Sequence, residues 1–274
     1  MINDQERQWI YRHAYLPEHL PDYVEAVSGA EPFLHRNYLC FLGQKHLIFN
    51  GYRLGPDSDP PARIYDFLCE RFQPTTVALI ASSIWLPAEQ YEQQAADCYY
   101  RLDLPLAPID AAVAYMLRRA RRDLQVSRVS FGKEHKKIIK AFVAGHSFNR
   151  QQKHLFKHIP QYLNSSDSAV LFEARRENDL VAFNIVDLGA ADYAFYLFSF
   201  RSSKINVPGA SDLLFHKMVN LAHTEGKKAV NLGLGVNAGI RRFKEKWGGA
   251  PFLKYSSFLV DNREVDIGRL AKKL

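Results

Sequence analysis

In the second half of the chain, apolar and polar residues alternate with periods that predict a regular order of strands and helices. Strict alternation predicts an antiparallel meander of three strands, at residues 169–175, 180–187 and 193–201. Helical spacing predicts three helices around this meander, at residues 135–144, 152–163 and 210–223. With a strand from residue 125 and a last strand at 252–260, residues 125–260 are expected to form one complete mixed α+β domain.

In residues 227–249 a predicted strand, a glycine turn and a basic helix follow one another directly, with no linker between them. Residues 229–234 are apolar enough for a sheet strand, and Gly233 and Gly235 permit backbone conformations that other residues avoid. Asn237 is a good helix N-cap, so a helix is expected to begin near Ala238. Such a close succession is more typical of a site than of a scaffold.

Helical spacing divides this helix into an apolar and a basic side. The residues expected to face a core are Ile240, Phe243 and Trp247. Arg241 and Lys244 are then expected together on one flank of the helix. Arg242 and Lys246 are expected at more exposed positions. On composition alone, a solvated basic face closed by a Gly-Gly C-cap is an equally good interpretation.

The run GIRRFKEKWGG at 239–249, with the strand before it, resembles the C-terminal signature of the Fem-type peptidyltransferases and related members of the GNAT (GCN5-related N-acyltransferase) superfamily. Upstream, VPGASDLLFHKMVNLAHTEGKKAVNLGLG at 207–235 is similar to the loop, helix and strand at the centre of GNAT domains and of the aminoacyl-tRNA-dependent lipid lysyltransferases. The resemblance implies a GNAT-type mixed sheet in which the strands 193–201 and 229–234 run parallel and diverge at one end to admit an acyl donor.

The first half of the chain has a similar succession of elements, with strands predicted at 38–42, 46–52, 76–81 and 98–104 and helices at 62–72 and 88–94. The segment SSIWLPAEQYEQQ at 82–94 carries acids and amides where the second half has RRFKEK, so this copy would lack the cationic site. We therefore predict a tandem GNAT-like acyl-CoA N-acyltransferase fold, with a degenerate N-terminal domain at 1–110, a linking helix at 111–124 and a complete domain at 125–274. An unrelated α+β N-terminal domain is the alternative.

GNAT domains normally bind the pyrophosphate of coenzyme A at the N-terminus of the helix that follows the fourth strand, because its N–H groups and dipole attract anions. The resemblance implies these donor-binding residues: Asn206, Val207, Gly209, Ala210, Ser211, Asn231, Gly233, Gly235, Asn237 and Arg241. The loop KINVPGASDLL matches the usual phosphate pattern only loosely. Asp212 would repel phosphate there, and Ser211 and Asp212 fit helix caps better than ligands.

In the Fem-type enzymes the lysine of the FK motif lies by the reacting acyl group, and the resemblance transfers that position to Lys244. An ammonium there would stabilise the oxyanion of a tetrahedral intermediate. Tyr196 and Tyr255 could give a proton to the leaving group. Asp187 or Glu173 could accept the proton of an amine nucleophile, and His146 lies where GNAT domains shape the acceptor site. Packing tyrosines and paired strand carboxylates are the alternative interpretation of these residues.

The net charge and the cysteine content indicate which kinds of partner and which cellular compartment are favoured. A formal net charge of +7 favours a polyanionic partner such as tRNA, a phosphorylated cofactor, an acidic lipid or an acidic carrier protein. Basic residues cluster at 118–122, 133–140 and 241–246, but no aromatic RNA-recognition signature accompanies them. Three cysteines, at 40, 69 and 98, lack disulfide or zinc spacing, so no metal is expected. The polar N-terminus and the lack of a long apolar run favour a cytoplasmic protein.

Together these observations predict an N-acyltransferase that moves an acyl group from acyl-CoA to an amine on a small molecule or peptide. Two alternatives stay open. One is an aminoacyl-tRNA-dependent transferase of the Fem type. The other is a non-catalytic GNAT-fold module whose basic face binds RNA or an acidic partner.

Overall fold

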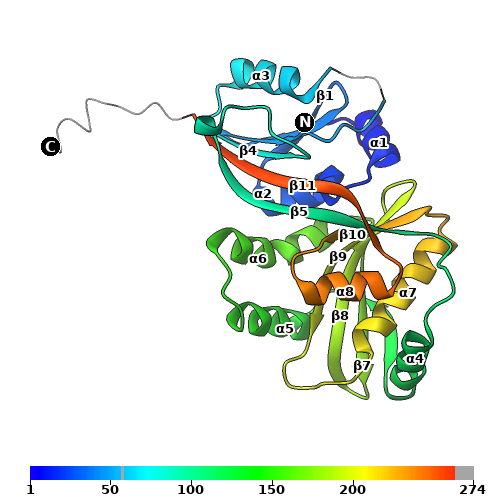
Figure 1. The fold of residues 1–274 in the computed structure, drawn as a ribbon. Helices are drawn as coiled ribbons and strands as arrows, with labels where there is room; N and C mark the ends of the chain where they lie inside the picture. Colours follow the sequence, from blue (N-terminus) through cyan, green and yellow to red (C-terminus); the bar gives the residue numbers. More distant parts are fainter. Residues whose placement is uncertain (57–58, 263–274) are drawn as a thin grey trace. The chain divides into compact units, whose positions relative to one another are not determined.

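The structure is a computed structural model that describes residues 1–56 and 59–262 (Figure 1). The chain folds into two compact units. The first unit comprises Met1–Ile2, Ala30–Ala96 and the described residues from Lys254 on, and the second comprises Asn3–Gly29 and Asp97–Leu253. Each unit therefore combines residues from both halves of the sequence.

The sheet of the first unit has the strand order β1-β2-β3-β4-β11. The strands are β1 Glu31–His35, β2 Tyr38–Leu42, β3 His46–Asn50, β4 Thr76–Ala81 and, from Lys254 on, β11 Ala250–Asp261. Neighbours run antiparallel except β3 and β4, which run parallel. A parallel pair needs a crossover, and helix α3, Pro61–Phe72, supplies it while burying Ile64 and Leu68 against the sheet.

The sheet of the second unit has the strand order β5-β10-β9-β8-β7-β6. The strands are β5 Glu92–Asp103, of which residues from Asp97 on belong here, β10 Ala229–Leu234, β9 Tyr193–Arg201, β8 Asp179–Asp187, β7 Ala169–Arg176 and β6 Gln125–Val129. The pair β10 and β9 is parallel, and the other pairs are antiparallel.

Helices cover both faces of this second sheet, and alternate residues of β8 belong to two different cores. Ala182 and Val186 pack in the core that also holds residues of α4 Ala111–Asp123, α7 Ala210–Thr224 and the end of α8 Ala238–Lys246. Phe183 and Ile185 pack in the core of the other face, with residues of α2 Pro21–Ser28, α5 Lys133–Ala144 and α6 Arg150–Ser165. The two faces follow from the period of two along a strand.

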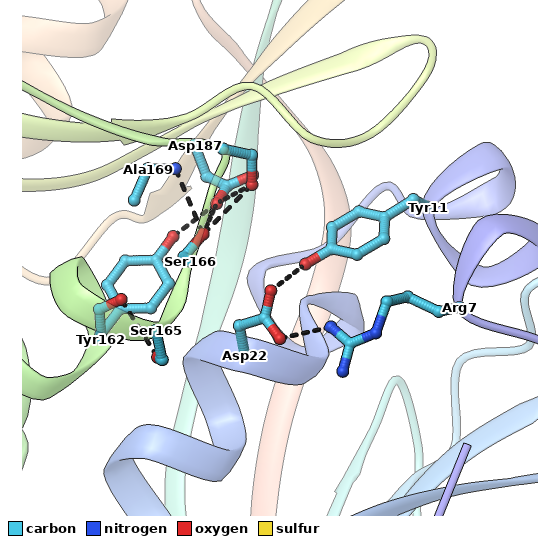
Figure 2. A network of polar contacts seen from close by, with 9 residues as sticks. Arg7, Tyr11, Asp22, Tyr162, Ser165, Ser166, Ala169 and Asp187 are labelled. Carbon is cyan, nitrogen blue, oxygen red and sulfur yellow. Dashed lines mark hydrogen bonds and ion pairs between the residues drawn. The ribbon is translucent and has the colours of Figure 1, made fainter. Parts of the chain in front are cut away.

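A buried carboxylate on β8 organises the second of these faces (Figure 2). Asp187 is 1% exposed and accepts hydrogen bonds from the Tyr162 hydroxyl at 2.6 Å, the Ser168 hydroxyl at 2.9 Å and the Gly189 N–H at 2.8 Å. The Ser166 hydroxyl adds a longer one at 3.3 Å. Burial and the neighbouring carboxylate raise the pKa of Tyr162 well above its ordinary value, so its hydroxyl keeps the donated proton. Four donors replace the water that a buried charge loses.

The N-terminal helices belong to this unit because they are tied into the same face (Figure 2). Helix α1, Asp4–His13, is joined to α2 through Asp22, which accepts from the Tyr11 hydroxyl at 2.8 Å and pairs with Arg7. Helix α2 packs along α6, where Tyr23 lies edge-on to Tyr162 with ring centroids 5.3 Å apart. A 3₁₀ turn, Pro17–His19, separates the two helices.

The predicted element order is confirmed across the second half. The strands 193–201 and 229–234, and the start of a helix at Ala238, are found at the predicted residues. The helix predicted at 88–94 is wrong, because a short 3₁₀ turn, Ala88–Gln90, follows Pro87 and β5 already begins at Glu92. Strand β1 and the two N-terminal helices, α1 and α2, were not predicted from the sequence.

The two halves of the sequence exchange their last strands: the last strand of each half pairs with a strand of the other half. Strand β5 ends the first half and pairs with β10, whereas β11 ends the second half and pairs with β4. The compact units therefore do not follow the boundaries of the predicted domains at 1–110, 111–124 and 125–274. The predicted duplication of the two halves stays a prediction. The predicted linking helix is present as α4, inside the second unit.

We expect Asp187→Ala to lower the free energy of unfolding by at least about 2 kcal/mol, because it leaves several buried donors without their charged acceptor. Urea denaturation followed by circular dichroism measures this. The control is Asp192→Ala, which removes an exposed carboxylate paired with Lys228 and should change stability by less than about 0.5 kcal/mol. Equal losses in both variants would contradict the structural role of Asp187.

Candidate functional site

The parallel strands β9 and β10 pair at one end only, as predicted. Their register runs from Tyr193 opposite Ala229 to Phe195 opposite Asn231, and beyond these residues no pairing joins the two described strands. Strand β9 bulges at the same place, since Tyr196 and Phe198 lie opposite consecutive residues of β8 and Leu197 is the extra residue. A bulge bends and twists its strand, so it helps to open a gap between β9 and β10.

Lys244 of helix α8 reaches the start of this gap. Its side chain is buried, with 3% of the residue exposed, and its Nζ donates a 2.5 Å hydrogen bond to the Leu234 carbonyl at the end of β10. A Cβ placed on Gly233 would lie 4.0 Å from this Nζ and 3.8 Å from the Tyr196 carbonyl. The ammonium therefore lies beside the backbone of β10, close to the point where the two strands diverge.

Burial lowers the pKa of Lys244 to about 7, because an ammonium loses hydration that one carbonyl does not replace. The carboxylate of Asp97 opposes this shift. The Nζ also lies 5.4 Å from the centroid of the Tyr100 ring, whose face attracts a cation. Near neutral pH, Lys244 can therefore hold or release a proton, which is the property that acid–base and electrostatic catalysis require.

The sequence of α8 explains why a lysine is buried here. Asn237 caps the helix by accepting from the Ile240 N–H at 3.0 Å, as predicted. The double glycine is needed at the other end. Gly248 has φ +86°, and a Cβ on Gly249 would lie 2.5 Å from Leu232 and 2.9 Å from the Lys244 carbonyl. Only glycine lets the helix end pack this closely on β10.

The predicted core face of α8 is partly wrong. Trp247 is 2% exposed and Phe243 is half-buried, but Ile240 is 37% exposed, and Lys244 is buried in its place. The short nine-residue helix turns its second half toward the sheet, so its first turn contributes little to the core. The expected common flank is therefore divided: Arg241 is exposed, while Lys244 points inward.

Asp212 of α7 holds the C-terminal end of α8. It is 7% exposed, accepts the Trp247 indole N–H at 3.0 Å and pairs with the Lys246 Nζ at 2.5 Å. The Trp247 ring also packs on Phe215 of α7, with centroids 4.9 Å apart. Asp212 is therefore not a helix cap, as had been expected, and Lys246 compensates the charge that would have repelled a phosphate.

In the part of the chain that the structure describes, the N-terminus of α7 has no side-chain cap hydrogen bond. Its N-cap is Gly209, with φ +83°, and a Cβ there would lie 2.8 Å from the Met116 carbonyl of α4, so glycine is required by close packing. The loop before it is ordered by Arg201, which donates to the Asn206 side chain at 2.5 Å. Uncapped N–H groups with a nearby guanidinium suit an anion such as a phosphate.

Of the other predicted donor residues, Val207 and Ala210 are buried in the core beside α4, whereas Ser211 is half-buried at the helix start. Asn231 is fully buried and already occupied: its Nδ2 donates to the Tyr15 carbonyl at 2.7 Å, and its Oδ1 accepts from the Gly233 N–H at 2.8 Å. Its role is to hold the turn in β10, not to contact a ligand through its side chain.

Tyr196 lies in this site, but Tyr255 belongs to the first unit. Tyr196 is half-buried, stacks on Phe243 with centroids 6.5 Å apart and lies edge-on to Phe215. Burial is the main cause that raises the pKa of Tyr196 to about 12, so its hydroxyl is protonated at neutral pH. A protonated phenol beside the gap is suited to donate a proton.

The carboxylates and the histidine that were predicted near the acceptor have other partners. Asp187 is saturated in its network, and Glu173 is buried between Arg175, at 2.7 Å, and the Nε2 of His135, at 3.1 Å. The Nδ1 of His135 accepts from the Gly132 N–H at 2.9 Å, so both ring nitrogens are used in structural contacts. His146 is exposed and donates to the Phe142 carbonyl at 2.7 Å.

Asp97 is a site residue that sequence reasoning missed. Its two carboxylate oxygens accept from the Cys98 N–H at 2.7 Å and from the Val236 N–H at 2.6 Å. Val236 has φ +55°, which costs a branched residue about 1–2 kcal/mol, and Asp97 stabilises that conformation. A Cβ on Gly235 would lie 2.8 Å from Asp97, so the glycine lets this carboxylate approach. Asp97 was not predicted because it lies far in sequence from the motif at 227–249.

Within residues 1–56 and 59–262, no group of three or more histidine, cysteine, aspartate or glutamate side chains is arranged to hold a metal ion. The same part of the chain contains no helix that is both long and apolar enough to cross a membrane.

No protein-family model matches the sequence, and no curated protein does. Solved structures do match over nearly the whole chain. The C-terminal domain of a putative lysylphosphatidylglycerol synthetase from Agrobacterium fabrum is 15% identical, with a TM-score of 0.61 over 98% of this chain and 94% of that one. FemX is 10% identical, with a TM-score of 0.61 over 93% of this chain and 96% of that one. A tandem GNAT protein from the clavulanic acid biosynthesis pathway is 13% identical, with a TM-score of 0.55 over 96% and 97%.

These likenesses confirm the predicted fold class. The chain has the GNAT-type mixed α+β fold, and its structural neighbours include FemX and the C-terminal domain of a putative lysylphosphatidylglycerol synthetase. At 10–15% identity the comparisons define the fold, and the activity has to be argued from the site.

Lys244→Met should change how stability depends on pH. The folded state lowers the pKa of Lys244 to about 7, below the unfolded value near 10.5, so between these values the unfolded chain binds more protons. The free energy of unfolding of the wild type should therefore rise relative to the variant, by up to about 1.4 kcal/mol per pH unit above pH 7. Below pH 7 the difference should be constant. Urea titrations from pH 6 to 9 measure it, and parallel curves would contradict the shift.

Trp247→Phe should cost about 1.5–3 kcal/mol, because it keeps most of the ring packing but removes the hydrogen bond to the buried Asp212 carboxylate. Thermal and urea unfolding measure the loss. Lys246→Gln is the comparison: its side chain is 38% exposed, so its ion pair with Asp212 should contribute less than about 1 kcal/mol. A larger loss for Lys246→Gln would show that the ion pair, not the indole, holds α8 to α7.

Proposed function

We propose that this protein is an acyltransferase that moves an acyl group from a thioester or ester donor to an amine, with Lys244 at the reacting centre. The observation that carries the proposal is the buried ammonium of Lys244, bonded to the end of β10 where β9 and β10 part. A lysine is almost never fully buried unless it is paired, and a group whose pKa is strongly shifted by burial beside a gap is a candidate for function.

The donor enters between β9 and β10 in this proposal, with its acyl carbonyl near Lys244. Attack by the amine converts the carbonyl to a tetrahedral oxyanion, and the ammonium stabilises that charge more strongly than it stabilises the neutral donor. When the bond to the leaving sulfur or oxygen breaks, the protonated hydroxyl of Tyr196 is suited to give the leaving group its proton. The proton that the attacking nitrogen loses then returns to Tyr196, directly or through water. The acceptor amine has to bind in its neutral form, and positioning supplies much of the remaining rate enhancement.

Acyl-CoA is our first choice of donor. The support is the uncapped N-terminus of α7, the adjacent Arg201, and the neutralisation of Asp212 by Lys246, which together leave this end of the helix favourable for a pyrophosphate. Coenzyme A would supply the activated thioester, while Lys244 and Tyr196 would act on its carbonyl and its leaving sulfur.

An aminoacyl-tRNA donor is the second candidate. It is favoured by the fold likeness to FemX and to a putative lysylphosphatidylglycerol synthetase domain, and by the chain's net charge of +7, which suits a polyanion. The same chemistry at Lys244 would serve an aminoacyl ester. A small-molecule or peptide amine remains the proposed acceptor, and a cytoplasmic location remains our expectation.

Thermal unfolding with acetyl-CoA, longer acyl-CoAs and charged tRNA tests the proposal. A donor present at 100 times its dissociation constant should stabilise the protein by about 2.7 kcal/mol. Lys244→Ala should keep the fold while weakening donor binding or transfer at least tenfold, equivalent to about 1.4 kcal/mol. Arg242→Ala is the matched control, because this exposed side chain lies on the same helix and, among the described residues, bonds only to the Ala238 carbonyl.

The outcomes separate the candidates. Stabilisation by acyl-CoA that is lost in Lys244→Ala and kept in Arg242→Ala supports the first donor, and the same pattern with charged tRNA alone supports the second. Equal small losses in both variants would mean that α8 contributes only diffuse positive charge. The non-catalytic binding module would then replace the enzyme.

A further inference from the structure

A large groove runs between α5 and α6, and the acyl-transfer chemistry proposed above makes no use of it. The two helices lie side by side on the sheet face that α2 also covers (Figure 1). The groove has a volume of about 1180 Å³, which exceeds the roughly 300–1,000 Å³ of ordinary small-molecule pockets. Its size favours a macromolecular segment over a metabolite.

The lining residues have a helical repeat on both walls. On α5 they include Lys136, Lys140 and Val143, and on α6 they run from Lys153 to Ser165. His146, which follows α5, also lines the groove. These α6 positions span three turns, about 18 Å at 1.5 Å per residue. The groove is therefore a trough parallel to the helices, long enough for three turns of another helix.

The floor and the rim of the trough differ in chemistry. The floor consists of buried or half-buried apolar side chains: Phe131, Ile139, Val143, Phe156 and Pro160. The rim consists of four exposed lysines, two on each helix at i, i+4 spacing: Lys136, Lys140, Lys153 and Lys157. No aspartate or glutamate is among the lining residues, and within the described chain none of the four lysines forms an ion pair.

We propose that this groove docks an amphipathic helix of a partner protein whose apolar face is flanked by acidic side chains. An apolar trough takes the face of a helix through residues at i, i+3, i+4 and i+7. Lysines on both rims match carboxylates on both flanks of such a helix, and they would repel a basic one. The proposal is independent of acyl transfer, because it assigns a binding surface on the other face of the sheet from Lys244.

The test uses a synthetic 16-residue fluorescent peptide with leucines on one helical face and glutamates on both flanks, measured by fluorescence anisotropy against the full chain. Binding should weaken at least tenfold in the double variant Lys140→Gln/Lys157→Gln and in Val143→Ser, which removes apolar floor. Lys133→Gln/Lys137→Gln is the control, since these exposed lysines of α5 do not line the groove, and it should change affinity less than twofold. Circular dichroism and thermal unfolding confirm that each variant is folded.

Three results would overturn the proposal. A scrambled peptide of the same composition that binds equally well would show that only charge is recognised. Equal weakening by the rim and the control variants would show that the groove is not the site. Groove-dependent binding of anionic phospholipid vesicles without binding of the amphipathic peptide would assign the surface to lipid. None of these results bears on donor binding at Lys244, so this test and that of the proposed function can fail separately.

Discussion

The site of the second unit depends on the burial of one lysine where two parallel strands part. Strands β9 and β10 exchange hydrogen bonds only as far as Phe195 and Asn231, and the carbonyl of Leu234 beyond that point accepts from Lys244 instead. At Leu234 β10 still pairs with β5, but its edge toward β9 is no longer paired there, and a carbonyl on that edge would otherwise lack a partner. The ammonium therefore supplies the donor that this carbonyl lost when the strands diverged, and its own incomplete hydration lowers its pKa.

Several neighbouring features follow from placing Lys244 there. Helix α8 has to approach β10 closely, which requires Gly249, and its end has to be fixed, which Trp247 and Asp212 achieve. The turn that leads into α8 adopts a strained conformation at Val236, which Asp97 holds. Each contact restricts where the Nζ can lie, and a fixed donor stabilises a transition-state charge better than a mobile one.

The sequence predicts the elements of the second half well, because its strands alternate strictly and its helices carry caps. Asn237 marks the helix start that the structure has at Ala238, and the helix predicted at 210–223 is found at Ala210–Thr224. The first half has weaker signals: the 3₁₀ turn at Ala88–Gln90 could not be distinguished from a helix, and the strand predicted at 98–104 begins earlier, at Glu92. Its partner β10 is distant in sequence. Local pattern cannot reveal such pairings.

The site shows the same limit. The motif identified Lys244, but helical spacing assigned it to a flank, since a lysine contributes nothing to an apolar stripe. Its burial results from the packing of α8 on β10, and Asp97 enters through β5. Among the residues that the resemblance assigned to the donor, the side chain of Asn231 bonds to backbone groups. In the described chain the N-terminus of α7 has no side-chain cap hydrogen bond.

The balance of charges around Lys244 sets what the site can do. A lysine with a pKa near 7 has its charged and neutral forms close in free energy, so a modest new interaction decides between them. The charge of Asp97 favours the ammonium form of Lys244, although no described hydrogen bond joins the two side chains. The face of the Tyr100 ring adds a weak attraction. An oxyanion forming beside the Nζ would add a stronger one, so the charge that appears during acyl transfer would itself hold the proton on Lys244. Desolvation thus makes the ammonium respond most strongly at the moment when negative charge develops.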